Sequence, residues 1–159
     1  MVTYVKGDAT KPQGDGKKII AHICNDSGRW GAGFVKAISQ KSTEPELRYR
    51  EWYRQTKERG DYFLPLGHVQ FVSCSATITV ANMVAQHGTY SAKYNPHPIS
   101  YDALEYCLNK VALVAEAENS SVHMPRIGTG LARGNWEVIE SVINRTLTLR
   151  DIDVTVYDL

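Results

Sequence analysis

The chain has 159 residues, enough for one domain with its own core, and its 43% hydrophobic and 22% charged residues are ordinary for a soluble globular protein. A formal net charge of +1 gives no general attraction to nucleic acid or to a membrane surface, and no apolar run is long enough to span a bilayer. We therefore expect a single domain over residues 1–159. The first residues lack the pattern of a signal peptide, so we expect a cytoplasmic protein.

The first elements along the chain are two strands and a helix. Residues 2–6 have the β-branched and aromatic character of a short strand, and a turn-rich connection follows. A second strand has the core Ile19-Ile20-Ala21, whose continuous apolar character is typical of an inner strand covered on both faces. A helix is expected from about Phe34 to Gln40.

A further helix is expected to begin after Thr43, which can act as its N-cap, and to run to about Glu58. Pro45 in its first turn fits because a proline there loses no helical hydrogen bond. Its arginines between Arg48 and Arg59 form a basic face, which we interpret as solvated surface.

The second half continues the alternation of strands and helices. Strands are expected over residues 68–73 and 77–84, followed by an irregular stretch, 89–99, that is either a binding loop or plain surface. Ser100 can cap a helix that runs to about Glu118.

The last elements are a strand over residues 121–124, a helix capped by Asn135, and a strand over residues 153–157. Strands alternating with helices predict an α/β fold, in which helices flank a sheet.

Two glycine-rich loops stand out, each after a predicted strand and before a predicted helix. The first is Gly31-Ala32-Gly33, and the second runs from Pro125 to Gly134. Glycine lets a ligand approach the backbone, and a helix start offers unpaired N–H groups to an anion. A lone G-x-G is also compatible with a tight turn that holds no ligand. Two such loops at one edge of a sheet suit a ligand with a diphosphate.

Four stretches, in this order along the chain, resemble the macrodomain family. They are Val5-Lys6-Gly7-Asp8, His22-x-Cys24-Asn25-x-x-Gly28-x-Trp30-Gly31-x-Gly33, Met124-Pro125-Arg126-Ile127-Gly128-Thr129-Gly130-Leu131 and Val154-Thr155-Val156-Tyr157-x-Leu159. Within the family, the likeness is to the branch holding the ADP-ribose-1''-phosphate phosphatase and the terminal ADP-ribose protein glycohydrolase. The resemblance implies a three-layer α/β/α domain with a central mixed sheet. It also implies that ADP-ribose or ADP-ribose-1''-phosphate binds in a cleft along the strand ends, with ADP-ribosylated protein as a further partner.

The resemblance also implies roles for individual residues. Asp8 would accept from the adenine amino group, Asn25 and the first loop would line the distal ribose, and Tyr157 would lie against the adenine. The second loop would wrap the diphosphate with its backbone N–H groups. The ligand-binding residues implied are Gly7, Asp8, Ala9, Asn25, Gly31, Ala32, Gly33, Phe34, Arg126, Ile127, Gly128, Thr129, Gly130, Leu131 and Tyr157.

The catalytic candidates are His22, as a general acid or base, and Asn25, which would help to position water. A structural, hydrogen-bonded His22 is the alternative. The glycohydrolase branch uses a lysine and an aspartate where this chain has Gln86 and Ala132, so its covalent mechanism is not expected here.

Two functions from different classes remain at this point. One is an enzyme that hydrolyses ADP-ribose-1''-phosphate or an ADP-ribosyl ester, and the other is a reader that binds ADP-ribose without chemistry. Nucleic-acid binding through the Arg48–Arg59 face is a weaker idea, because the chain's charges balance. No His, Cys and carboxylate spacing indicates a metal site, and no cofactor is expected.

Overall fold

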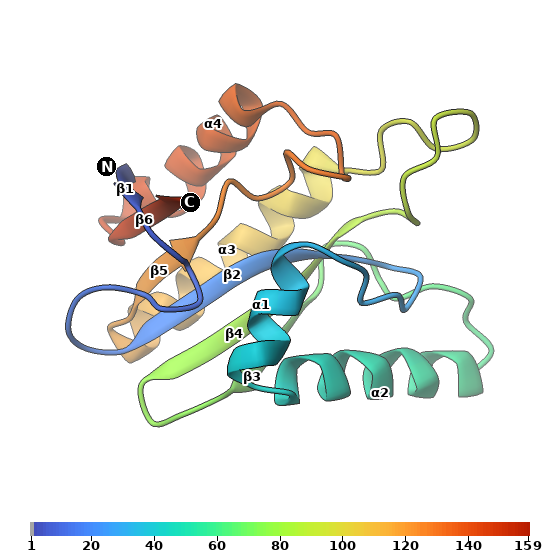
Figure 1. The fold of residues 1–159 in the computed structure, drawn as a ribbon, viewed down its shortest axis with the longest axis horizontal. Coiled ribbons are helices and arrows are strands. Elements are labelled where there is room, and N and C mark those ends of the chain that lie inside the picture. The colour runs from blue at the N-terminus through green and yellow to red at the C-terminus, as the bar shows by residue number, and fades with distance from the viewer. Residues whose placement is uncertain (1) are drawn as a thin grey trace.

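The computed structural model describes residues 2–159 (Figure 1). Its strands are β1 (Val2–Lys6), β2 (Lys18–Asn25), β3 (Val69–Ser73), β4 (Ile78–Gln86), β5 (Ser121–Met124) and β6 (Val154–Asp158). Its helices are α1 (Phe34–Lys41), α2 (Glu44–Glu58), α3 (Tyr101–Glu118) and α4 (Trp136–Thr146), with the short 3-10 turn η1 (Thr148–Arg150). The elements predicted from the sequence are all present, with small shifts at their ends. None of the helices in the described part of the chain is long and apolar enough to cross a membrane.

The strands form one mixed sheet in the order β1-β6-β5-β2-β4-β3. Only β3 runs antiparallel to its neighbour, β4, and the other pairs are parallel. The predicted inner strand, β2, lies between β4 and β5, and nearly all of its residues are buried. Parallel pairing on both sides needs helices on both faces, which explains its continuous apolar run.

Successive residues of β2 enter two separate cores, because side chains alternate across a strand. Ile19 and Ala21 pack with α3 and α4, whereas Ile20 and Cys24 pack with α1 and α2. In Figure 1, α1 and α2 cross one face of the sheet and α3 crosses the other. The chain is therefore the expected three-layer α/β/α domain.

Two of the three predicted helix caps form. The Ser100 side chain accepts from the Ala103 N–H at the start of α3, and Asn135 caps α4 in the same way. The prediction for Thr43 is wrong, because this residue already has helical dihedral angles and its side chain makes no capping bond. Instead, the Ser42 hydroxyl accepts from the Glu44 N–H at 3.3 Å.

The basic face of α2 is largely neutralised by its own glutamates. Arg48 pairs with Glu44 and Arg50 with Glu46, and Arg54 contacts the carboxylates on both sides of it, those of Glu51 and Glu58. These pairs are exposed and follow the spacing of one helical turn. Arg48, Arg50 and Arg54 are therefore each paired within α2.

The two cap predictions can be compared in one experiment. We expect Asn135→Ala to lower the free energy of unfolding by about 1 kcal/mol, because two N–H groups at the start of α4 lose their acceptor. Thr43→Ala is the matched control and should leave stability nearly unchanged. Denaturant unfolding measures both, and equal losses in the two variants would contradict this account of the caps.

Candidate ligand-binding cleft

The carboxyl ends of β2, β4 and β5 meet at one edge of the sheet, where the structure has a cleft of about 450 Å³. Both glycine loops line it, with Gly33 following β2 and Gly128 following β5. The expectation that two loops distant in the sequence are neighbours is therefore confirmed. The lining consists of His22, Ile23, Ala32, Gly33, Phe34, Val35, Gln86, Pro125, Arg126, Ile127, Gly128, Thr129, Gly130, Leu131 and Ala132.

The first loop ends in a row of backbone donors. Within residues 2–159, the N–H groups of Gly31 to Val35 donate no hydrogen bond. Those of Phe34 and Val35 belong to the first turn of α1, where no helical partner exists. Gly33 has φ 86° and ψ −132° at the helix start, a conformation that is essentially restricted to glycine.

The second loop offers a similar row. In the described part of the chain, the N–H groups of Gly128 to Ala132 make no hydrogen bond, whereas those of Arg133 and Gly134 turn back onto Gly130 and Gly128. A Cβ at Gly128 would lie 2.7 Å from a methyl group of Ile99, so only glycine fits there. Two rows of free amide donors along one cleft form a site for an anion.

His22 is 3% exposed, and its Nε2 lies 2.5 Å from Oδ1 of Asn82. The Asn82 amide nitrogen donates to the carbonyl oxygen of Pro45, which can only accept, so its Oδ1 must face the histidine. The imidazole therefore carries its proton on Nε2 and a lone pair on Nδ1. Burial lowers the pKa of His22 to about 4, so the ring is neutral near pH 7.

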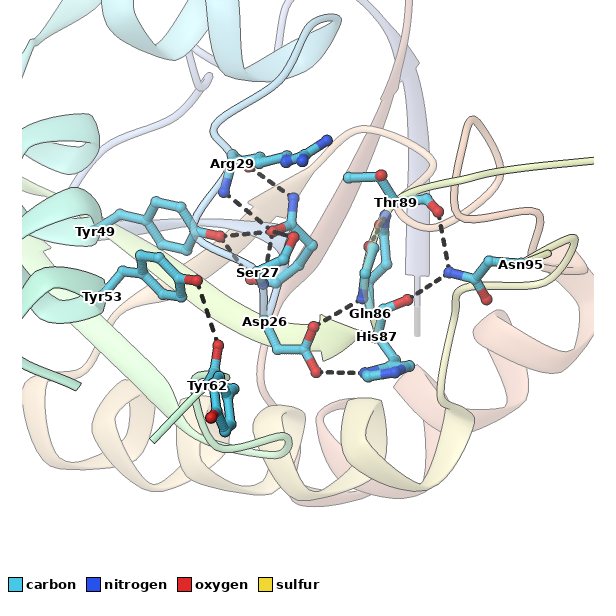
Figure 2. Close-up of polar contacts among 12 residues, drawn as sticks. Asp26, Ser27, Arg29, Tyr49, Tyr53, Tyr62, Gln86, His87, Thr89 and Asn95 are labelled. Carbon is cyan, nitrogen blue, oxygen red and sulfur yellow. Dashed lines mark hydrogen bonds and ion pairs between the residues drawn. The ribbon is translucent and has the colours of Figure 1, made fainter. Parts of the chain in front are cut away.

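Asn25 does not line the cleft in this structure. Its Oδ1 accepts from the N–H and hydroxyl of Ser27, and its Nδ2 donates to the Arg29 carbonyl at 2.6 Å (Figure 2). The Tyr49 hydroxyl donates to the Asn25 carbonyl oxygen. The Asn25 side chain, which was predicted to position water, instead makes the hydrogen bonds that stabilise the turn before the first loop.

The predicted adenine-side residues also lie outside the cleft lining. Gly7, Asp8 and Ala9 form the turn after β1, and one Asp8 oxygen accepts from the N–H and hydroxyl of Thr10. The hydrogen bonds from Thr10 lower the pKa of Asp8, and its second carboxylate oxygen has no hydrogen bond within residues 2–159.

Tyr157 is 3% exposed, and its ring packs under the turn formed by Gly7, Asp8 and Ala9. A Cβ at Gly7 would lie 3.4 Å from the ring. The Tyr157 hydroxyl accepts from the Gln13 N–H at 2.8 Å and lies 2.7 Å from Nδ1 of His123. The structure thus places Tyr157 beneath the Asp8 turn and not on the surface of the cleft.

Arg126 lines the cleft, but its charge is already paired. The guanidinium makes two hydrogen bonds to the Asp158 carboxylate, at 2.7 and 3.0 Å. It also lies 4.9 Å from the ring centre of Tyr4 and 5.3 Å from that of Trp136. An anion in the cleft would therefore meet backbone amides before it meets a free guanidinium.

Five of the lining residues were not predicted from the sequence as ligand-binding, namely Ile23, Val35, Gln86, Pro125 and Ala132. Gln86 and Ala132 were named only because they stand where the glycohydrolase branch has its catalytic lysine and aspartate. That correspondence could have predicted that both residues line the cleft. Within residues 2–159, no carboxylate or lysine lines the cleft. Among residues 2–159, no group of three or more His, Cys, Asp or Glu side chains could hold a metal ion.

No family model matches this chain. Among solved structures, a Bacteroides thetaiotaomicron protein of unknown function is 51% identical with a TM-score of 0.92, and the similarity covers all of this chain and 98% of that one. A macrodomain protein from Streptomyces coelicolor is 45% identical with a TM-score of 0.85, over 100% of this chain and 99% of that chain.

The curated relatives include proteins of very different length. A Mus musculus chromodomain-helicase-DNA-binding protein 1-like is 34% identical over 98% of this chain, which spans only 17% of that protein. The ADP-ribose 1''-phosphate phosphatase of Lodderomyces elongisporus is 27% identical over 98% of this chain and 97% of that one. The human ADP-ribose glycohydrolase OARD1 is 26% identical over 99% and 91%, respectively.

The two buried histidines predict how stability depends on pH. Burial lowers the pKa of both His22 and His123 to about 4, and the nearby charge of Lys18 adds to the effect at His123. An unfolded histidine titrates near pH 6.5, so between the two values the unfolded chain binds more protons. We expect the free energy of unfolding to fall as the pH drops from about 6.5 to about 4 and to be steady just above this range. Urea unfolding at a series of pH values measures it, and stability that is constant across the range would contradict the neutral, buried state of both rings.

Proposed function

This chain belongs to the macrodomain family, and we propose that it binds ADP-ribose or a derivative of it in the cleft between the two glycine loops. Family membership follows from the 45% identity to a macrodomain protein over 99% of that chain. Relatives matched over nearly their whole length are named for ADP-ribose chemistry. The observation that carries the proposal is the pair of unpaired amide rows along one cleft, which suits a pyrophosphate.

The sheet order gives the proposed ligand a direction. The Gly7 N–H donates to the backbone oxygen of Asp158, whose side chain holds Arg126 at the cleft wall. The Asp8 turn therefore adjoins the β5 and β6 side of the cleft, and Gln86 lies on the β4 side. We place the adenosine toward Asp8, whose free oxygen can accept from an amino group, and the distal ribose toward Gln86. A protein carrying an ADP-ribosyl group would then approach at the Gln86 side.

Binding is tested by calorimetry with ADP-ribose and the variant Gly33→Glu. We expect the wild type to bind and the variant to lose binding, because glutamate puts a negative charge and an unfavourable backbone angle into the first loop. Gly60→Glu is the matched control, since Gly60 also has a positive φ and open space around it but lies after α2. Absence of ADP-ribose binding by the wild type would refute the proposed site.

Hydrolysis of ADP-ribose-1''-phosphate or of an ADP-ribosyl ester is the second part of the proposal. The contacts of the His22 ring are made through Nε2, and within residues 2–159 no buried side-chain nitrogen or oxygen is left without a partner. Nδ1 must therefore reach solvent, and His22 lines the cleft. A neutral imidazole with a free lone pair can accept a proton from a water molecule as that water attacks the substrate.

A reader without chemistry is the second candidate, and the cleft lining favours it. Gln86 and Ala132 stand where the resemblance implies catalytic groups, and among the described residues neither a carboxylate nor a lysine lines the cleft to act as a base or nucleophile. An enzyme built on this cleft would depend on His22 and on the substrate's own phosphates.

Incubation with ADP-ribose-1''-phosphate and with mono-ADP-ribosylated protein separates the two candidates. If the chain is an enzyme, phosphate or ADP-ribose is released, and His22→Ala abolishes turnover while ADP-ribose binding remains. Because the pKa of His22 is about 4, its base form predominates above that value, and turnover should rise through pH 4 and then level off. Tight binding without release from either substrate would instead identify a reader.

A further inference from the structure

The first glycine loop is held in place by the turn that follows β2. The parallel register between β2 and β4 shifts between Cys24 and Asn25, which ends the regular ladder. From this point the Asn25 side chain supplies hydrogen-bond partners to the turn. Its amide contacts both Ser27 and Arg29, so the side chain closes the turn on itself.

Helix α2 holds this turn through a buried tyrosine. Tyr49 is fully buried, and its hydroxyl lies 2.6 Å from the Asn25 backbone oxygen and 2.9 Å from Oδ1 of the same residue. Burial raises the pKa of Tyr49, so the phenol keeps its proton and acts as the donor. Figure 2 shows the hydroxyl directed from α2 into the turn.

The same turn is connected to the following segment of the loop by Trp30. The indole ring lies 5.5 Å from the ring of Tyr49 and 5.4 Å from that of His22. Its Nε1 donates to the Val35 carbonyl and to the Ser39 hydroxyl of α1. Residues 31–33 therefore lie between Trp30 and the start of α1, two points that are fixed to each other.

A buried carboxylate secures the turn on its other side. Asp26 accepts from the Gly88 N–H and contacts Nδ1 of His87, both at 2.7 Å. Its backbone N–H and carbonyl bond to Gln86 and Leu64. These Asp26 contacts join the turn to the neighbouring loops. The hydrogen bond that Asn25 receives from α2 comes from the Tyr49 hydroxyl.

We propose that Tyr49 is a positioning residue for the anion-binding loop: through Asn25, its hydroxyl holds the amides of Ala32 to Val35 in place along the cleft. This inference rests on the proposed function, because it assigns Tyr49 to ADP-ribose binding although the side chain never touches the ligand. A loop with preset donors loses less conformational entropy on binding than a mobile one, so the hydroxyl should contribute to affinity.

The test compares Tyr49→Phe with Tyr53→Phe. Both tyrosines lie on α2 and face the turn, but the Tyr53 hydroxyl donates to the Tyr62 carbonyl and not to Asn25 (Figure 2). Phenylalanine fills the space of either ring, so both variants should fold. We expect Tyr49→Phe to weaken ADP-ribose binding by about fivefold to tenfold, the effect of one lost hydrogen bond, and Tyr53→Phe to bind like the wild type.

Hydrogen exchange supplies the measurement that a purely structural role would not change. Tyr49→Phe should speed amide exchange at Asp26, Ser27 and Arg29, whose N–H groups are hydrogen-bonded in the turn. The bonded amides of Arg133 and Gly134 in the second loop should exchange as in the wild type, and the melting temperature should fall by only about 2–4 °C. Asn25→Asp should act in the same direction, because the carboxylate cannot donate to Arg29. In the double variant, Asn25→Asp should weaken ADP-ribose binding by less than it does alone, because both substitutions act on the same turn.

Two results would overturn the inference. One is unchanged ADP-ribose affinity in Tyr49→Phe, and the other is faster exchange throughout the chain, which would mean that the variant is globally destabilised. If the wild type itself binds no ADP-ribose, the proposed function fails, while the local exchange pattern still decides whether Tyr49 holds the loop.

Discussion

The parallel pairing of β2 with both β4 and β5 is the constraint on which the other features depend. Parallel strands end at the same edge, so this pairing brings together the segments that follow β2, β4 and β5. The two glycine loops follow β2 and β5, and Gln86 is the last residue of β4; together they form most of the cleft. An antiparallel partner for β2 would have sent one of the loops to the opposite edge of the sheet.

The cleft that we propose as the ligand site offers an anion backbone amides more than free charged side chains. Arg126 is held by Asp158 and two aromatic rings, and His22 is neutral. The fixed amides therefore provide the attraction for an anion, without the side-chain entropy cost of ordering a long cation. The same arrangement leaves few groups for chemistry, and in the part of the chain that the structure describes His22 is the one titratable base in the lining.

The irregular stretch 89–99 has a structural role that connects the two loops. At one end, Asp26 bonds to His87 and Gly88 just before the stretch begins. At the other end, the Ile99 N–H donates to the Ala132 carbonyl, and near the start of the stretch the ring centre of Tyr90 lies 4.2 Å from the Arg133 guanidinium. Movement of either loop is therefore opposed by contacts that pass through this segment.

Short-range patterns in the sequence determined the elements, the inner position of β2, the caps at Ser100 and Asn135, and the two glycine loops, because hydrophobic periodicity and capping chemistry act over a few residues. Only the tertiary structure decided which side chains reach the cleft. Asn25 and Tyr157 are committed to Ser27, Arg29 and Gln13, and Tyr49 holds the first loop from a helix that looked like plain surface. A side chain's hydrogen-bond partners come from distant parts of the chain, so their geometry exists only after the layers have packed.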